Sequence, residues 1–124
     1  MDNYLAIDLG DKRVWIARNI QNIAFAHKIV PRVELISYLK ETFKSSNDIN
    51  GIVVGLPYDL YGKDLRQLNK TQDFIQKLQN IFPDIHVYGH DERYSSFLAD
   101  QDSSEHRDDI AAQHILQSFL DTNI

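Results

Sequence analysis

Residues 4–29 read YLAIDLGDKRVWIARNIQNIAFAHKI, and this stretch determines the fold that the sequence predicts. Apolar segments rich in Ile, Ala, Val and aromatic residues alternate in it with short turns that carry Gly, Asp and Asn, a pattern typical of β-strands joined by hairpins. The segments cover residues 4–7, 13–20 and 23–29. Because strands joined by connections this short pair antiparallel, we expect an antiparallel meander.

The rest of the chain alternates predicted helices with predicted strands. The spacing of apolar residues predicts helices over 31–43, 64–81, 96–100 and 108–120, and strands over 51–57 and 85–88. Pro31 is placed to open the first of these helices, and Gly89 to end the last strand. Strand–helix–strand units require parallel crossovers. We therefore expect an α/β fold with a mixed five-stranded sheet, in which parallel crossovers follow the antiparallel meander and helices cover both faces.

A single domain accounts for the length and the composition. The chain has 124 residues, of which 43% are hydrophobic and 25% charged, as in an ordinary globular protein. The absence of cysteine excludes a disulfide framework, a thiol nucleophile and a cysteine-bound metal. No apolar run approaches the roughly 20 residues of a membrane span, and the first residues lack the pattern of a signal peptide. We expect one domain over residues 1–124, in the cytoplasm and without a membrane partner.

The net charge bears on the kind of partner. The 13 Lys and Arg residues and the 18 Asp and Glu residues give a net charge of −5. Nucleic-acid-binding proteins usually carry a basic patch, because neutralising phosphates supplies much of their affinity. A net negative charge therefore makes nucleic-acid binding less expected. A local basic patch or bound metal ions can nevertheless reverse the sign of the charge at one site.

Three carboxylates stand at the ends of predicted elements. Asp8 ends the first strand, Glu92 follows the strand over 85–88, and Asp108 begins the last helix, above its apolar stripe. If they lie together, their mutual repulsion requires a cation, and hard divalent ions such as Mg²⁺ take oxygen ligands of this kind. Ordinary roles stay open for each residue alone: a helix cap for Asp108, a solvated or arginine-paired acid for Glu92 and a turn residue for Asp8.

Four segments, in order along the chain, carry a resemblance to a known family. They are residues 6–14 (AIDLGDKRV), 52–57 (IVVGLP) with Gly62 after them, 91–96 (DERYSS) and 108–117 (DDIAAQHILQ). They resemble motifs of the YqgF/RuvX family of Holliday-junction resolvases and pre-16S rRNA nucleases, which belongs to the ribonuclease H-like superfamily. An Asp-x-Gly after a strand also opens the actin-like ATPases, so each segment alone is a weak signal. The four together are specific and span nearly the whole chain.

The resemblance implies a ribonuclease H-like fold and a metal-dependent endonuclease. The catalytic, metal-binding carboxylates of the family fall on Asp8, Glu92 and Asp108, which would hold one or two Mg²⁺ or Mn²⁺ ions. Two such ions about 4 Å apart can activate water to hydrolyse a phosphodiester bond. The implied partner is structured RNA at the 5′ end of pre-16S rRNA, or branched DNA in the older proposal. The chain would act as a monomer or as a homodimer.

Basic residues beside the three acids are candidates for substrate binding. Lys12, Arg13 and Arg93 flank the carboxylates and could hold phosphates, since arginine suits bidentate contact with a phosphate group. An ion pair with a nearby aspartate is an equally good interpretation of the two arginines.

Two features depart from the family pattern. Trp15 stands where the family usually has glycine, and its ring either packs in the core, as we expect, or faces substrate. The segment over 96–108 is shorter than usual and nearly lacks Lys and Arg. A shorter, less basic segment would weaken the affinity for nucleic acid or change the substrate.

Two other functions stay open at this point. A non-catalytic nucleic-acid-binding module of the same fold would suit the acidic charge, whereas the presence of all three carboxylates favours an enzyme. An ATP-binding relative of the sugar kinases and actin is disfavoured by the length, because those proteins enclose their nucleotide between two domains. The chain also has no G-x-x-x-x-G-K phosphate-binding loop.

Overall fold

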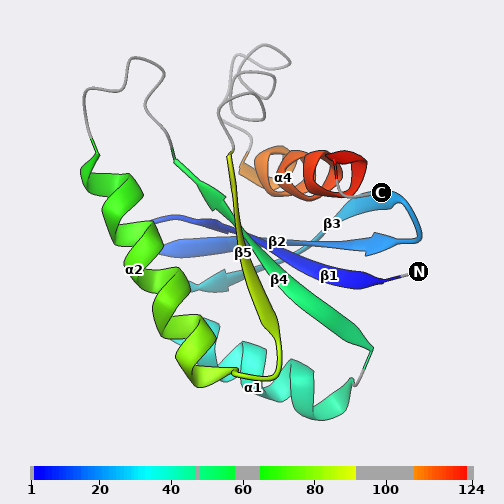
Figure 1. The fold of residues 1–124 in the computed structure, drawn as a ribbon, viewed down its shortest axis with the longest axis horizontal. Helices are drawn as coiled ribbons and strands as arrows, with labels where there is room; N and C mark the ends of the chain where they lie inside the picture. Colours follow the sequence, from blue (N-terminus) through cyan, green and yellow to red (C-terminus); the bar gives the residue numbers. More distant parts are fainter. Residues whose placement is uncertain (1, 47, 58–64, 92–107, 123–124) are drawn as a thin grey trace.

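The computed structural model describes residues 2–46, 48–57, 65–91 and 108–122. Within these residues, a five-stranded β-sheet carries helices on both of its faces (Figure 1). The strands are β1 (Asn3–Leu9), β2 (Arg13–Ile20), β3 (Ile23–Pro31), β4 (Ile49–Leu56) and β5 (His86–Asp91). The helices are the 3₁₀ helix η1 (Arg32–Glu34) and the α-helices α1 (Leu35–Ser45), α2 (Arg66–Ile81) and α4 (Asp108–Thr122). The short helix predicted over 96–100 lies outside the described residues.

The sheet joins an antiparallel half to a parallel half. Its strand order is β3-β2-β1-β4-β5. β1, β2 and β3 pair antiparallel as consecutive hairpins, whereas β4 lies parallel to β1 and β5 parallel to β4. The predicted mixed sheet, with a meander followed by parallel crossovers, is therefore confirmed. β1 is the central strand and the place where the two halves meet.

Two predicted boundaries are wrong. Pro31 is the last residue of β3 and not the first of a helix, because its backbone, with φ −59° and ψ 140°, is extended. Gly89 lies inside β5 and does not end it. A Cβ at Gly89 would lie 3.1 Å from a methyl carbon of Leu56 and 3.2 Å from one of Ile75. Glycine is placed here by close packing between the sheet and α2.

The sheet buries a separate apolar core on each face. One core lies against α1 and α2 and includes Leu5 and Ile7 of β1. The other lies against α4 and includes Ala6 of the same strand. Successive residues of a strand point to opposite faces. Asp8 therefore continues the series that faces α4.

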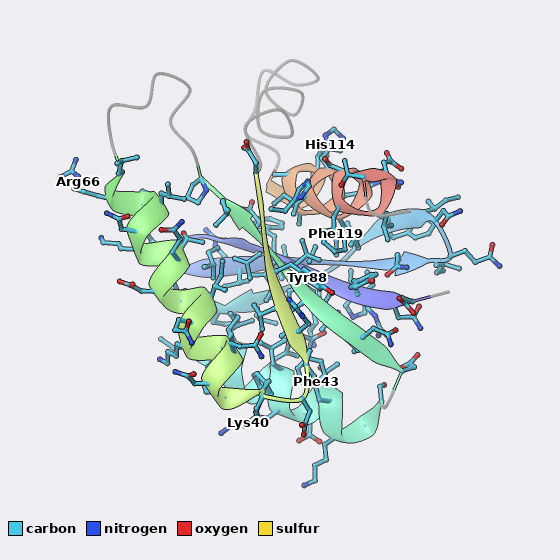
Figure 2. The ribbon with its side chains drawn as sticks, in the orientation of Figure 1. Lys40, Phe43, Arg66, Tyr88, His114 and Phe119 are labelled. Carbon is cyan, nitrogen blue, oxygen red and sulfur yellow. The ribbon has the colours of Figure 1, made fainter. Side chains whose placement is uncertain are left out.

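Aromatic side chains fasten α4 to the sheet. The ring of Phe119 lies 5.1 Å from that of Tyr4 and 4.9 Å from that of Tyr88, measured between centroids. Figure 2 shows Phe119 on the helix side of this contact and Tyr88 on the sheet side. Each such pair adds about 0.5–1.5 kcal/mol beyond the area it buries. The cluster holds α4 against the strands whose ends lie beside its first turn.

Candidate functional site

The turn after β1 holds the end of that strand in place. The backbone amide of Gly10 donates a hydrogen bond of 2.9 Å to the carbonyl of Arg13. A Cβ on Gly10 would lie only 2.6 Å from the same carbonyl oxygen, closer than any side chain tolerates, so the turn requires glycine. Asp8, half-buried two residues earlier, is therefore presented by a tight and well-defined turn.

Asp8 lies in a row with residues of the two neighbouring parallel strands. Ile7 pairs with Val54 in the β1–β4 ladder, and Gly55 pairs with His90 in the β4–β5 ladder. Asp8, Gly55 and His90 therefore occupy the same level of the sheet, and the alternation of side chains places all three on the α4 face. Since glycine has no side chain, β4 places nothing between Asp8 and His90 on this face.

His90 is engaged by α4. Its Nε2 atom lies 2.9 Å from the hydroxyl of Ser118, and its ring meets that of Phe119 edge-on, 5.9 Å between centroids. Burial lowers the pKa of His90 below its ordinary value of 6.5, and the negative charge of Asp91 opposes this shift only in part. A histidine held by a hydroxyl and an aromatic ring, with its pKa lowered by burial, acts here as a packing residue.

A cleft opens at the same end of β1 and β4, beside the first turns of α2. Its volume is about 510 Å³. Two cations, Arg32 and Lys70, approach it from different elements. The guanidinium of Arg32 donates a hydrogen bond of 2.9 Å to the carbonyl of Gly10 and lies 5.2 Å from the centre of the Phe74 ring. The cleft is lined by Asp8, Leu9, Gly10, Asp11, Arg32, Gly55, Pro57, Gln67, Lys70 and Thr71.

Sequence reasoning missed Arg32 and Lys70. No motif contains either residue, and they come together only because η1 and α2 pack on the same side of the sheet. The available signal was local: Arg66 and Lys70 lie one helical turn apart at the start of a predicted helix. Figure 2 shows Arg66 at that end of α2.

The predicted substrate-binding residues fall around the β1–β2 turn or outside the described chain. Lys12 and Arg13 are both exposed. The carbonyl of Lys12 accepts a hydrogen bond of 2.8 Å from the backbone amide of Arg32, so the turn and η1 are joined. Glu92 and Arg93 lie outside the described residues.

Of the two remaining carboxylates, only Asp108 has a described backbone, and Glu92 is placed by its position in the sequence alone. β5 ends at Asp91, directly before Glu92, and Asp108 is the first residue of α4, with a side chain outside the described part. Figure 1 shows the end of β5 and the start of α4 at the same side of the molecule, next to the end of β4. Among the described residues no three His, Cys, Asp or Glu side chains cluster. Asp8 is the one predicted ligand whose surroundings the structure describes.

This arrangement suits a divalent cation. The predicted donors are three carboxylates and no sulfur or imidazole, which is the oxygen chemistry that Mg²⁺ and Mn²⁺ prefer. Asp8 is half-buried at a strand end and borders a cleft of polar character. A fixed carboxylate next to solvent-accessible space can take part in a metal site that substrate reaches.

Comparison with solved structures gives the class of protein. The fold is similar to that of T. thermophilus RuvC, solved in complex with a Holliday junction substrate, with a TM-score of 0.58 at 9% sequence identity over 98% of this chain and 96% of that one. The chain has a ribonuclease H-like fold.

The family follows from the sequence comparisons. A family model described as "RuvX: Holliday junction resolvase" matches residues 2–122. The chain belongs to this family, which is also called YqgF, as the sequence motifs predicted. It is 33% identical to a protein of Fusobacterium nucleatum over 98% of both chains. It is 34% identical to one of Amoebophilus asiaticus over 97% of this chain and 94% of the relative. Both relatives carry the name "Putative pre-16S rRNA nuclease".

The length and hydropathy of a helix decide whether it can cross a membrane. None of the described helices combines the length and the apolar character that crossing a bilayer requires.

Proposed function

We propose that this chain is a divalent-metal-dependent endonuclease that cleaves structured nucleic acid, and that its substrate is the 5′ region of pre-16S rRNA. One observation carries the proposal. Asp8 ends the central strand of a ribonuclease H-like sheet, half-buried beside a cleft that two cations border. Membership of the RuvX family and the names of the relatives support the same chemistry.

The metal ligands in this proposal are Asp8, Glu92 and Asp108. Asp8 is fixed by its strand and by the glycine turn that follows it. Glu92 directly follows β5, and Asp108 begins α4. A bound Mg²⁺ or Mn²⁺ would supply an activated water and neutralise charge on the phosphate. The carboxylates place that ion, and the tight packing of α4 on the sheet keeps the first turn of the helix near the strand ends.

The substrate backbone would be held by cations around the cleft. Arg32 and Lys70 line it, and Lys12 and Arg13 directly follow Gly10 and Asp11, which also line it. We also assign Arg93 to this group from its place beside Glu92. These residues supply local positive charge in a chain whose net charge is −5, which is how an acidic protein can bind a polyanion.

Branched DNA is the second candidate substrate. The description of the family model names a Holliday junction resolvase, and the structural neighbour was solved on a Holliday junction. Symmetric cutting of a junction requires two active sites, so this candidate also requires a homodimer. RNA cleavage has no such requirement and is compatible with a monomer.

A side-by-side cleavage assay tests the proposal. The full chain, with Mn²⁺ or Mg²⁺, receives a structured precursor-rRNA fragment and a four-way DNA junction in separate reactions. We expect cutting of the RNA fragment that is lost in Asp8→Asn. The matched control is Asp84→Asn, an exposed aspartate in the turn before β5, at the opposite end of the sheet. That variant should cleave like the unmodified chain.

Two results would contradict the proposal. Undiminished metal-dependent cutting by a folded Asp8→Asn variant would remove Asp8 from the metal site. No cutting of either substrate by the folded protein would favour the non-catalytic binding module. Cutting of the DNA junction alone would keep the nuclease and replace its substrate.

A further inference from the structure

Trp15 and Asp8 are neighbours across the β1–β2 ladder. The two residues are direct partners in the antiparallel register, which places their Cα atoms about 5 Å apart and their side chains on the same face. Trp15 packs against the core on the α4 side, as the core-packing interpretation predicted. It is nevertheless only half-buried, so part of the indole is accessible to solvent.

The accessible part of Trp15 borders a surface groove. The groove has a volume of about 480 Å³ and lies along β2 and β3. Ile29 pairs directly with Trp15 and is 47% exposed. Ala26 also lines the groove and is exposed, and its small side chain leaves the space beside the indole open. The walls therefore combine the indole of Trp15 with aliphatic side chains, and His27 and Lys28 add polar groups.

Among the described residues, the position of α4 leaves this groove uncovered, and a β-bulge lies beside it. The β2–β3 register shifts between Ile16 and Ala17, so His27 is an extra residue on β3. Gln117 of α4 donates a hydrogen bond of 2.8 Å to the carbonyl of Asn22, which places the end of the helix over the β2–β3 hairpin tip. No described helix covers the other end of β2 and β3 on that face, where Trp15 is half-buried and Ile29 exposed.

A cation lies on the same face of β2 as Trp15. Arg13 is two residues from Trp15 on β2, so both side chains lie on the same face. Lys28, although it also lines the groove, extends to the other face, where its ammonium lies 5.1 Å from the ring of Tyr38 in α1. Asp8, Trp15 and Arg13 thus form one continuous strip across the exposed end of the sheet.

We infer that Trp15 is a stacking platform for an unpaired base of the nucleic-acid substrate, next to the phosphate at the metal site that includes Asp8. An indole offers every base a face on which to stack, and Arg13 would contact a phosphate of the same strand. The inference rests on the proposed function, because that function places the strand at Asp8. It adds a requirement for unpaired bases beside the cleavage site.

The single tryptophan of the chain makes the test direct, because its fluorescence reports only on Trp15. The full chain is titrated with a single-stranded RNA oligonucleotide, in Ca²⁺ so that binding is measured without turnover. A second titration uses an abasic oligonucleotide of equal length, which has the same phosphates and no bases. We expect the RNA to quench the emission and the abasic strand to bind without quenching.

Variants separate stacking from general binding. Trp15→Leu should bind the RNA about tenfold more weakly and the abasic strand equally well, whereas Trp15→Phe should retain most of the affinity. Ala26→Leu fills the groove and keeps the tryptophan, so it should reduce both quenching and affinity. Its control is Phe25→Leu, an exposed position on the opposite face of β3, which should change neither.

The outcomes distinguish this inference from the function on which it rests. RNA binding without quenching, detected by the anisotropy of a labelled strand, would overturn the stacking role even in an active nuclease. An affinity of Trp15→Leu for the RNA equal to that of the unmodified chain would do the same. Quenching by RNA in a chain that cuts nothing would support the platform and overturn the nuclease. Absence of binding to any strand would overturn both.

Discussion

The backbone amide of Ala24 donates a hydrogen bond of 2.9 Å to the side-chain oxygen of Gln117, 93 positions later in the chain. Ala24 belongs to β3 and is buried, with 1% of its surface exposed, so water cannot readily replace this partner. The same glutamine also holds the carbonyl of Asn22. One side chain therefore fixes the later turns of α4 on the β2–β3 hairpin, and with them the direction from which the helix begins beside β5.

Replacement of Gln117 should weaken the whole fold. We expect Gln117→Leu to lower the free energy of unfolding by about 2 kcal/mol, because a buried amide and a carbonyl lose their partner. Urea unfolding measures this change. The control is Gln72→Leu, at an exposed position of α2, which should shift the free energy by less than about 0.5 kcal/mol. Equal effects of the two substitutions would contradict the assigned role.

Gly10 should tolerate no side chain. A Cβ would lie 2.6 Å from the carbonyl oxygen of Arg13, so Gly10→Ala must displace the turn that presents Asp8. We expect a loss of about 1–3 kcal/mol in the free energy of unfolding and a loss of cleavage larger than the unfolded fraction explains. The control is Asp11→Ala, at an exposed position in the same turn. It tests whether any substitution in the turn is enough to reduce stability and cleavage. Cleavage by Gly10→Ala at the unmodified rate would disconnect the turn from the site.

Lys70 should contribute to nucleic-acid affinity through its charge. It is exposed on α2 and borders the cleft beside Asp8. We expect Lys70→Gln to weaken RNA binding and to reduce the slope of log affinity against log salt by about one. Binding measured over a range of salt concentrations gives that slope. Lys40→Gln on α1, which Figure 2 shows at the opposite end of the molecule, should leave it unchanged. Equal slopes for both variants would place the substrate elsewhere.

The pH dependence of stability should reflect His90. Burial lowers its pKa below 6.5, so in the unfolded chain this histidine binds a proton at a higher pH than in the folded protein. The free energy of unfolding should therefore fall as the pH is lowered through about 6.5. His27 adds a dependence of the same sign, because burial and the charges of Arg18 and Lys28 lower its pKa as well.

Two variants isolate the contribution of His90 to the pH dependence of the free energy of unfolding. His90→Gln removes the titrating group and should flatten the dependence, measured by urea unfolding between about pH 7 and pH 5 without added metal. Ser118→Ala removes the 2.9 Å contact but keeps the buried imidazole. It should lower stability at every pH and leave the slope in place. An unchanged slope in His90→Gln would assign the effect to other groups.

The elements that the sequence predicted well are those encoded locally. The strands over residues 13–20 and 23–29 follow from alternating apolar residues and a two-residue turn, and β2 matches its predicted bounds. Gly89 was wrongly predicted to end its strand, because the contacts that require glycine there are not local in the sequence. It packs against Leu56 and Ile75, which are brought to it only by the folded sheet and α2. Pro31 was misplaced because an extended strand end and a helix start require nearly the same φ.

The candidate site was predictable in part for the same reason. The end of a strand marks Asp8, but the register that brings Gly55 and His90 to its level is a property of the parallel sheet. Arg32 and Lys70 are far apart in the sequence and share a cleft only after folding. Glu92 and Asp108 were identified through family motifs, and as metal ligands they stay predictions.

β3 is an edge strand, and the open edge of a sheet is where the sheets of two molecules can join. The extra residue at His27 interrupts its hydrogen-bonding pattern, and Pro31 has no amide hydrogen to offer at its end. A straight strand from another molecule can therefore match β3 over only part of its length. This irregular edge works against the growth of one continuous sheet through many copies. The chain can thus leave Phe25 and Ile29 exposed on that strand with a smaller tendency to aggregate.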